Sequence, residues 1–424
     1  MSAPAAVPDP VAPLPEAGAV PASGDDFSRW LCARTSRPVS VAAVLLLALS
    51  TVRAYAKEAI GIDNDVVVRA ARTLLEGGSP YADRRFLYLP GAAFAALPQT
   101  LLSERLLFYA VPAVTGLFVA LSLMPALALF DVRADSRLAA ALAAGTALFL
   151  PFHSIVSLGN WTVVSVAAFP LALLLARRGR WEAAAGVVGA SIALKPMLVP
   201  VLLLFVLARK WRALIWAVTL PASVSLVAAV AMPRPELFFT RTLPFLLHGQ
   251  DAYARPFDAS WPAVLERVGM PHPVALGLAV VVSLVVLGCA AVRWRCGGEK
   301  GLRLVETASL LMLAAFLGSR PSFLNYALVV VPSLAASVVV RAAAVRSVWF
   351  WMVLVPQLGG VPWPGVESAR RHAFKDIVMY TGMAAVLGLA AFRAWRRKGG
   401  LVTVSGDGYS LCSDPAAGNR PEMR

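Results

Sequence analysis

The chain has 424 residues, of which 58% are hydrophobic and only 15% charged, and its formal net charge is +15. Soluble domains carry roughly 25% charged residues, so this composition excludes an ordinary soluble globular protein. The basic residues cluster in short loops between long apolar blocks, which is typical of a multi-pass membrane protein, and no nucleic-acid partner is therefore expected.

The two ends of the chain differ in composition from its middle. A Pro/Ala-rich stretch predicts a disordered cytoplasmic tail over residues 1–35, and a polar stretch predicts a second one over 396–424. The membrane domain is predicted over residues 36–395. Its first apolar block, near 38–52, is the weakest span because Arg53 lies at its end.

The apolar blocks predict an all-α bundle of about 12 transmembrane helices. They are apolar on every face, whereas barrel strands would alternate, and backbone polar groups in lipid must be satisfied within a helix. After the first block, spans are expected near 106–130, 138–152, 161–176, 182–194, 197–208, 213–231, 273–292, 304–318, 325–340, 347–358 and 376–392.

Every second loop is rich in arginine and lysine. By the positive-inside rule these loops are cytoplasmic, so both termini are expected inside the plasma membrane and the long loops outside. The basic clusters lie at 177–180, 209–212, 293–303, 341–346 and 393–398.

The first extracytoplasmic loop carries two acids before an amphipathic stretch. Asp63 and Asp65 precede a run in which Val66, Ala70 and Leu74 recur with helical spacing, so an amphipathic helix is expected there. Carboxylates at a helix N-terminus are commonly caps. From these residues alone, both a cap and a functional site stay open.

Lys195 lies between two apolar runs with almost no polar sequence around it. Ionisable residues at the membrane boundary are costly and point to function, although a lysine that extends to the interface is an equal alternative.

A second group of candidates lies in the loop at residues 232–272. This loop mixes aromatic residues with Arg241, His248 and Asp251, and Arg320 occupies a similar position before a later span. Arginine suits bidentate phosphate recognition, whereas an interfacial aromatic and basic anchor is the alternative.

The sequence lacks the motifs of several common enzyme classes. There is no Walker loop, no GxSxG and no HExxH, and neither the four cysteines nor His153, His272 and His372 show metal-ligand spacing, so we expect neither a metal nor another cofactor. A solute pathway would place ionisable residues near the membrane midplane, where few are found. A catalytic site at the extracytoplasmic surface is therefore favoured over a transporter.

Three stretches resemble a known family. They are DNDVVVRAARTLLEGGSPYADRRFLYLPG, ALKPMLVPVLLLFVLARKWRAL and FFTRTLPFLLHGQDAYARPFDAS, and the first includes Tyr88 in a Tyr-x-Pro-Gly pattern. The chain resembles the GT-C superfamily of polyprenyl-phosphate-dependent glycosyltransferases over roughly residues 55–345. More closely, it is similar to the actinobacterial family of cell-wall α-(1→3)-arabinofuranosyltransferase and phosphatidylinositol-mannoside mannosyltransferases.

The resemblance implies roles for the candidate residues. Asp63 matches the general base of the first loop, with Asp65 as the alternative because the family commonly has an aromatic residue after the acid. Lys195, Arg241 and Arg320 would bind the donor phosphate. His248, Asp251 and Tyr88 are further candidates for the substrate site.

The resemblance also implies an activity. The expected reaction is inverting transfer of an arabinofuranosyl residue from decaprenyl-phosphoarabinose to a cell-wall arabinan, with a lipid-linked donor, a glycan or glycolipid acceptor and membrane lipids as partners. A mannosyl donor on the same fold, a lipid or polysaccharide transporter, and a non-catalytic partner subunit remain alternatives. The donor sugar, the acceptor, the linkage, the metal dependence and the oligomeric state are left open by the sequence.

Overall fold

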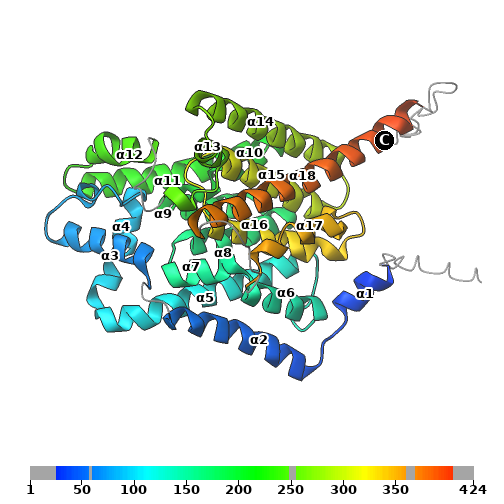
Figure 1. Cartoon of the computed structure of the whole chain (residues 1–424), viewed down its shortest axis with the longest axis horizontal. Helices are drawn as coiled ribbons and strands as arrows, with labels where there is room; N and C mark the ends of the chain where they lie inside the picture. The colour runs from blue at the N-terminus through cyan, green and yellow to red at the C-terminus, as the bar shows by residue number, and fades with distance from the viewer. Residues whose placement is uncertain (1–24, 57–59, 248–254, 360–367, 404–424) are drawn as a thin grey trace, which may run out of the picture.

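The computed structural model describes residues 25–56, 60–247, 255–359 and 368–403. These residues form helices and turns, with two isolated β-bridges and no strand among them (Figure 1). The prediction of an all-α chain is therefore confirmed for the described residues.

Six apolar segments among the described residues are long and apolar enough to cross a membrane, judged by length and composition. They are α2 (Arg37–Val52) with the 3₁₀ turn η1 (Arg53–Ala56), α5 (Glu104–Ala128), α11 (Trp211–Ala231), α14 (His272–Cys296), α15 (Lys300–Gly318) and α18 (Ser368–Thr403). Each coincides with a predicted apolar block, and the chain is a multi-pass helical membrane protein.

Shorter apolar helices occupy the other predicted blocks. They are α6 (Arg137–Leu148), α8 (Thr162–Arg177), α9 (Trp181–Leu194), η4 (Pro196–Val201) with α10 (Leu202–Leu207), η7 (Leu324–Tyr326) with α16 (Ala327–Ala336) and η8 (Ser337–Val339), and α17 (Val348–Met352) with η10 (Val355–Gln357). A straight helix needs about 20 residues to cross a hydrocarbon core. The total of about twelve spans therefore stays a prediction.

The block expected at 138–152 is divided in the structure. Helix α6 ends at Leu148, and α7 (Leu150–Leu158) begins after the extended residue Phe149. Pro151 lies in the first turn of α7, where its missing N–H costs nothing. The chain turns at this break and brings residues 159–161 to the end of the bundle where α3 lies.

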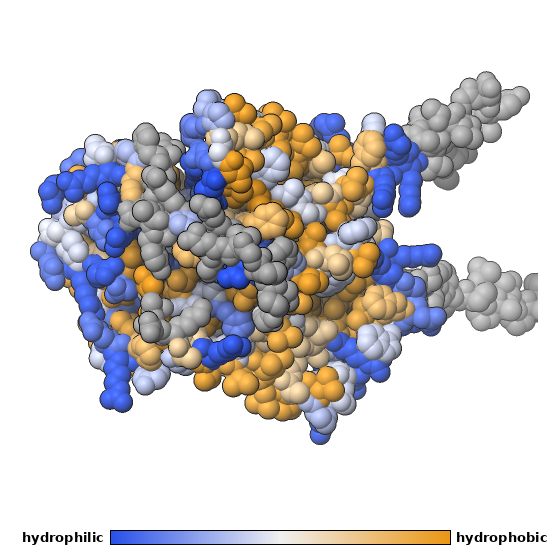
Figure 2. Space-filling view, viewed as in Figure 1, coloured by the Kyte–Doolittle hydropathy of each residue, from blue (hydrophilic) through white to orange (hydrophobic). Residues whose placement is uncertain are grey.

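Helix α15 lies at the centre of the bundle. In its most apolar 18-residue window 83% of the residues are buried, against 22–33% in the other five long segments. Those five present apolar side chains at the molecular surface, as expected for helices that face lipid. Figure 2 shows apolar side chains gathered over the middle of one face and hydrophilic ones toward both ends.

The end of the bundle that carries α3 has a small core of its own. The elements are α3 (Ile62–Leu75), η2 (Pro80–Ala82), α4 (Pro90–Ala95), η3 (Leu97–Leu101), the π-helical turn η5 (Phe238–Thr242) and α12 (Leu243–Leu247). They lie at the left of Figure 1. Val67, Ala71, Tyr81, Phe86 and Ala92 are fully buried among them. This packing gives the polar residues at that end a rigid support.

The opposite end carries α1 (Asp26–Cys32), which lies in the segment expected to be a tail. Asp25 pairs with Arg346, and Ser28 Oγ donates to Val339 O at 2.7 Å, so long-range contacts hold this helix. Likewise α18 extends to Thr403, beyond the start expected for the second tail. The remaining elements are η6 (Arg255–Phe257), α13 (Trp261–Arg267) and η9 (Ala344–Arg346).

Candidate functional site

Two glycines determine where α3 begins. Gly61 is its N-cap, with a left-handed φ of 71°, and its N–H donates to Ser157 O at 2.8 Å. Gly159 ends α7 with a φ of 61°. A Cβ on Gly159 would lie 3.3 Å from Gly61 Cα and 2.5 Å from Val111 Cγ1, so a side chain there would push the two segments apart. The first turn of α3 is thereby held against the loop that follows α7.

This docking joins an acid, an amide and a cation. Asp63 Oδ2 accepts a hydrogen bond from Asn160 Nδ2. Asn160 Oδ1 accepts from Lys195 Nζ at 2.8 Å and from the Thr162 backbone N–H at 2.8 Å. Lys195 Nζ also donates to Thr162 Oγ1 at 2.8 Å. We call these four residues the Asp63–Lys195 network; it unites two candidates that lie far apart in the sequence.

Lys195 lies at the break between two apolar helices. It is the C-cap of α9, with an extended backbone, and Pro196 starts η4. Its Nζ lies 5.4 Å from the centre of the Tyr88 ring and 5.6 Å from that of Tyr326. Both distances fall within the range of cation–π attraction, which helps to hold an ammonium group away from bulk water. Tyr88, a candidate from the sequence, is therefore part of this site.

The surroundings of Asp63 change its affinity for a proton. Burial raises the pKa of its carboxyl group above the ordinary value, while the Lys195 charge and the Asn160 hydrogen bond act in the opposite direction. Burial, and then the negative charge of Asp63, hold the pKa of Tyr88 well above its ordinary range. A carboxylate with raised proton affinity is suited to act as a general base.

Asp65, the alternative candidate, has different surroundings. Its side chain is 53% exposed, and its Oδ2 lies 2.7 Å from Arg69 Nη1, one turn further along α3. Such an exposed pair contributes about 0.3–0.5 kcal/mol to a helix. The same helical turn therefore directs Asp63 into the network and leaves Asp65 in a surface ion pair.

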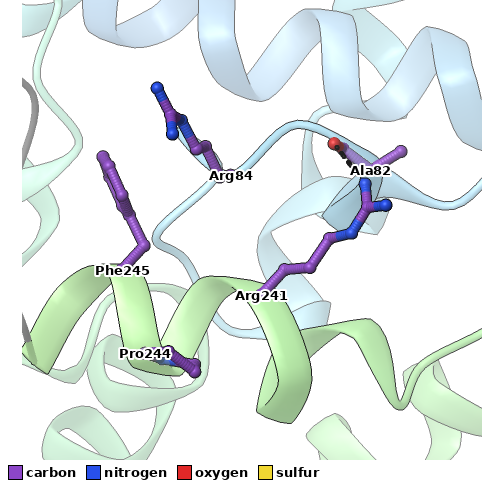
Figure 3. A pocket seen from close by; sticks show the side chains of 5 residues that line it. All are labelled: Ala82, Arg84, Arg241, Pro244 and Phe245. Carbon is purple, nitrogen blue, oxygen red and sulfur yellow. Dashed lines mark hydrogen bonds between the residues drawn. The ribbon is translucent and has the colours of Figure 1, made fainter.

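Arg241 lies in a separate hollow of about 450 Å³ between η2 and α12 (Figure 3). The hollow is lined by Ala82, Arg84, Arg241, Pro244 and Phe245. Arg241 Nη1 donates to Ala82 O at 3.5 Å, and the Arg84 guanidinium lies 5.2 Å from the centre of the Phe245 ring. Among the described residues, no contact joins Arg241 to the Asp63–Lys195 network.

Arg320 is engaged by a carboxylate. Its Nη2 lies 2.7 Å from Glu266 Oε2, and Glu266 Oε1 lies 2.5 Å from His272 Nδ1. The sequence could not predict this partner, because Glu266 lies on α13, 54 residues away. His248 and Asp251, the other two candidates, lie outside the described residues.

Sequence reasoning missed Asn160, Thr162 and Tyr326. A signal was present for the first two, since GNWT at residues 159–162 is a short polar interruption between apolar blocks. Tyr326 gave none, because an aromatic residue at the start of a span is ordinary at membrane interfaces. In the described part of the chain, no group of three or more His, Cys, Asp or Glu side chains is arranged to hold a metal ion.

Comparison with known proteins places the chain in a family. The family model for glycosyltransferase family 87 matches residues 86–319, a stretch that includes Asn160 and Lys195 and begins after Asp63. The chain is 30% identical over 222 residues to the α-(1→3)-arabinofuranosyltransferase of Mycobacterium tuberculosis strain H37Rv, which covers 51% of this chain and 49% of that protein.

A protein of the same name from Mycolicibacterium smegmatis is 30% identical over 136 residues, 32% of this chain and 31% of its own length. The chain thus spans about half the length, or less, of the curated relatives it matches. No solved structure matches. Since the family model matches more than half of its residues, the chain belongs to glycosyltransferase family 87.

Proposed function

We propose that this protein is a membrane glycosyltransferase that moves an arabinofuranosyl residue from decaprenyl-phosphoarabinose to a cell-wall arabinan acceptor, with inversion at the anomeric carbon. The single observation that carries the proposal is the network in which Asp63, Asn160 and Lys195 are joined by hydrogen bonds. The family and the name of the relatives support the class of reaction.

In the proposed reaction, Asp63 is the general base. An acceptor hydroxyl attacks the anomeric carbon of the donor and forms the new glycosidic C–O bond while its proton passes to the Asp63 carboxylate. The raised pKa of Asp63 supports this role, because burial strengthens the affinity of its carboxylate for the transferred proton. The bond between the anomeric carbon and the phosphate oxygen breaks in the same step.

Lys195 is proposed to stabilise the leaving group. The departing polyprenyl phosphate carries the electron pair of the broken bond, and a cation close to it lowers the energy of the transition state. The hydrogen bonds from Lys195 to Asn160 and Thr162 use two of its three N–H donors, and the third can bind a phosphate oxygen. Because the leaving phosphate is weakly basic, no protein acid is required.

The site is proposed to face the extracytoplasmic side. The basic clusters of the sequence gather in the loops that the positive-inside rule assigns to the cytoplasm, and residues 63, 160 and 195 lie in the alternate loops. A lipid-linked donor fits this placement, since its apolar tail can lie between exposed apolar helix faces.

The test is sugar transfer by the purified protein in nanodiscs. Synthetic polyprenyl-phosphoarabinose and polyprenyl-phosphomannose would be offered with matched oligosaccharide acceptors to wild type, Asp63→Asn, Asp65→Asn and Lys195→Met. We expect transfer from the arabinose donor, with kcat lowered about 10²-fold or more by Asp63→Asn and by Lys195→Met. Asp65→Asn is the matched control and should keep most of the activity.

Each other outcome changes the proposal in a defined way. Transfer from the mannose donor alone would overturn arabinose as the donor sugar but would leave the proposed mechanism unchanged. Loss of transfer activity in Asp65→Asn but not in Asp63→Asn would assign the role of general base to Asp65. No transfer from either donor by the folded wild type would instead favour a transporter or a non-catalytic partner subunit.

A further inference from the structure

Asn160 occupies the centre of the Asp63–Lys195 network. It lies in the loop between α7 and α8, and its side-chain amide is held on both sides. The carbonyl oxygen accepts from Lys195 Nζ and from the Thr162 backbone N–H, both at 2.8 Å. Two donors on this oxygen fix which way the amide faces, so Nδ2 must point toward Asp63.

The amide distinguishes the two oxygens of the Asp63 carboxylate. Oδ2 accepts the Asn160 hydrogen bond. In the part of the chain that the structure describes, no hydrogen bond to Oδ1 is found. The hydrogen bond to Oδ2 fixes the orientation of the carboxylate and leaves Oδ1 to accept a proton.

Asn160 also separates the base from the cation. No ion pair within 4.0 Å joins Asp63 to Lys195 among the described residues, although both bind the same amide. Direct pairing would hold the ammonium on the carboxylate and weaken it as a base. With the amide between them, the two charges stay apart, one available to an acceptor hydroxyl and the other to a phosphate.

We propose that Asn160 is the positioning residue of this site, holding Asp63 Oδ2 so that Oδ1 receives the acceptor proton and keeping Lys195 off the carboxylate. This inference rests on the proposed function and adds the atom that accepts the proton and the residue that orients it. Neither was assigned by the sequence or by the names of the relatives.

A purely structural role for Asn160 predicts something different. Its Oδ1 accepts the N–H of Thr162, the first residue of α8, and an aspartate would keep this bond and the bond from Lys195. Asn160→Asp therefore preserves these two bonds but replaces the N–H that holds Asp63 by a carboxylate oxygen. The new carboxylate, bound by an ammonium and a backbone N–H, stays ionised, and its charge raises the pKa of Asp63.

The charged and titratable groups around Asp63 bear on this expectation. Lys195 comes from the break after α9, Tyr88 from the segment before α4, and Tyr326 from η7. On α7, His153 lies beside Ser50 Oγ at 3.3 Å. On α3 itself, Asp65 is occupied by Arg69. Asn160→Asp leaves all of these groups unchanged.

The experiment compares Asn160→Asp with Asn64→Ala. Asn64 is also a buried asparagine, and it supports α3 by bonding Gln99 and Trp161 rather than Asp63 Oδ2. Carbodiimide labelling of Asp63, followed across pH by peptide mass spectrometry, reports protonation of this carboxyl group without turnover. Steady-state transfer provides kcat and the donor KM for the same variants.

We expect Asn160→Asp to keep the wild-type melting temperature, to move the midpoint of Asp63 labelling to higher pH, and to lower kcat at least about 10-fold with little change in donor KM. Asn64→Ala should lower the melting temperature without moving the labelling midpoint. An unmoved midpoint in folded Asn160→Asp would overturn the positioning role. A moved midpoint in a protein whose wild type transfers no sugar would instead overturn the proposed function alone.

Discussion

At the scale of single residues, the site depends on the Asp63 carboxylate, whose surroundings shift its pKa in opposite directions. Burial raises the pKa of Asp63, and the Lys195 charge and the Asn160 hydrogen bond lower it, with burial the larger effect. Its neighbour Asp65 is exposed and paired with Arg69. Two acids separated by one residue therefore differ in chemistry because the helix turns one of them inward.

This difference predicts the acid side of the pH–rate profile. A general base acts only when ionised, so activity must fall as pH drops through the pKa of Asp63. Because that pKa is raised, the fall should be centred above 3.8, the ordinary value for an aspartate. The measurement is kcat/KM for sugar transfer against pH in nanodiscs. In Asp65→Asn, kcat/KM should fall over the same pH range as in wild type. A fall centred at or below the ordinary aspartate pKa would contradict the prediction.

The sequence could single out Asp63, Lys195 and Tyr88 as candidates but could not predict the contacts that connect them. An acid before an amphipathic helix and a lysine between two spans each stand out against apolar surroundings. Asn160 does not, since a polar residue in a short loop is ordinary, and its partners lie 97 and 35 residues away. Arg241 and Arg320 stood out equally by type, yet tertiary packing gives them different partners.

At the scale of elements, the site depends on how closely α3 approaches the end of α7. Gly61 and Gly159 both adopt positive φ, and they lie close enough for one Cβ to matter. Hydropathy predicted the apolar blocks that became helices, but it could not predict the break at Phe149 or the turn at Gly159. Such breaks depend on the backbone conformation of single residues, whereas hydropathy reports only how apolar the side chains of a segment are.

Gly159→Ala should therefore disturb the site without touching any of its polar residues. The new Cβ would meet Val111 Cγ1 at 2.5 Å and Asn64 Cβ at 3.2 Å in a backbone conformation that alanine disfavours. We expect a loss of about 1–3 kcal/mol of stability and lower activity as α3 shifts. Thermal unfolding in detergent and sugar transfer would measure both.

Gly145→Ala is the matched control for this change. Gly145 lies inside α6, and a Cβ there meets nothing within 4 Å. The melting temperature of the Gly145→Ala variant should therefore be unchanged or slightly raised. Equal melting temperatures for Gly159→Ala and wild type would show that the close approach does not constrain the fold.

At the scale of the whole molecule, the chain has two polar ends and an apolar middle (Figure 2). The α3 end carries the Asp63–Lys195 network, and the other end carries α1, held by the pair of Asp25 with Arg346 (Figure 1). The alternation of basic loops predicts which loops share a side of the membrane. The sequence could not fix the number of spans, because six of the apolar helical segments within the described ranges are too short to be recognised as spans by their length.

Labelling of single cysteines distinguishes which end of the bundle faces the outside of the cell. Asp83 and Arg178 are exposed, the first in the loop after η2 and the second at the C-cap of α8, in a basic cluster assigned to the cytoplasm. In a background whose four cysteines are replaced by serine, Asp83→Cys should react with a membrane-impermeant maleimide in intact cells. Arg178→Cys should react only after the cells are permeabilised.

The result decides more than orientation, because the two sides of the membrane offer different donors. A site on the outside must take its sugar from a lipid carrier, since water-soluble activated sugars do not cross an apolar bilayer unaided. Labelling of Arg178→Cys but not Asp83→Cys in intact cells would place the network in the cytoplasm and remove the reason for a polyprenyl-linked donor. Labelling of Asp83→Cys alone would place Asp63 and Lys195 on the side where a lipid-linked donor is required, with the donor's tail among the exposed apolar helices and its phosphate at the membrane boundary where Lys195 lies.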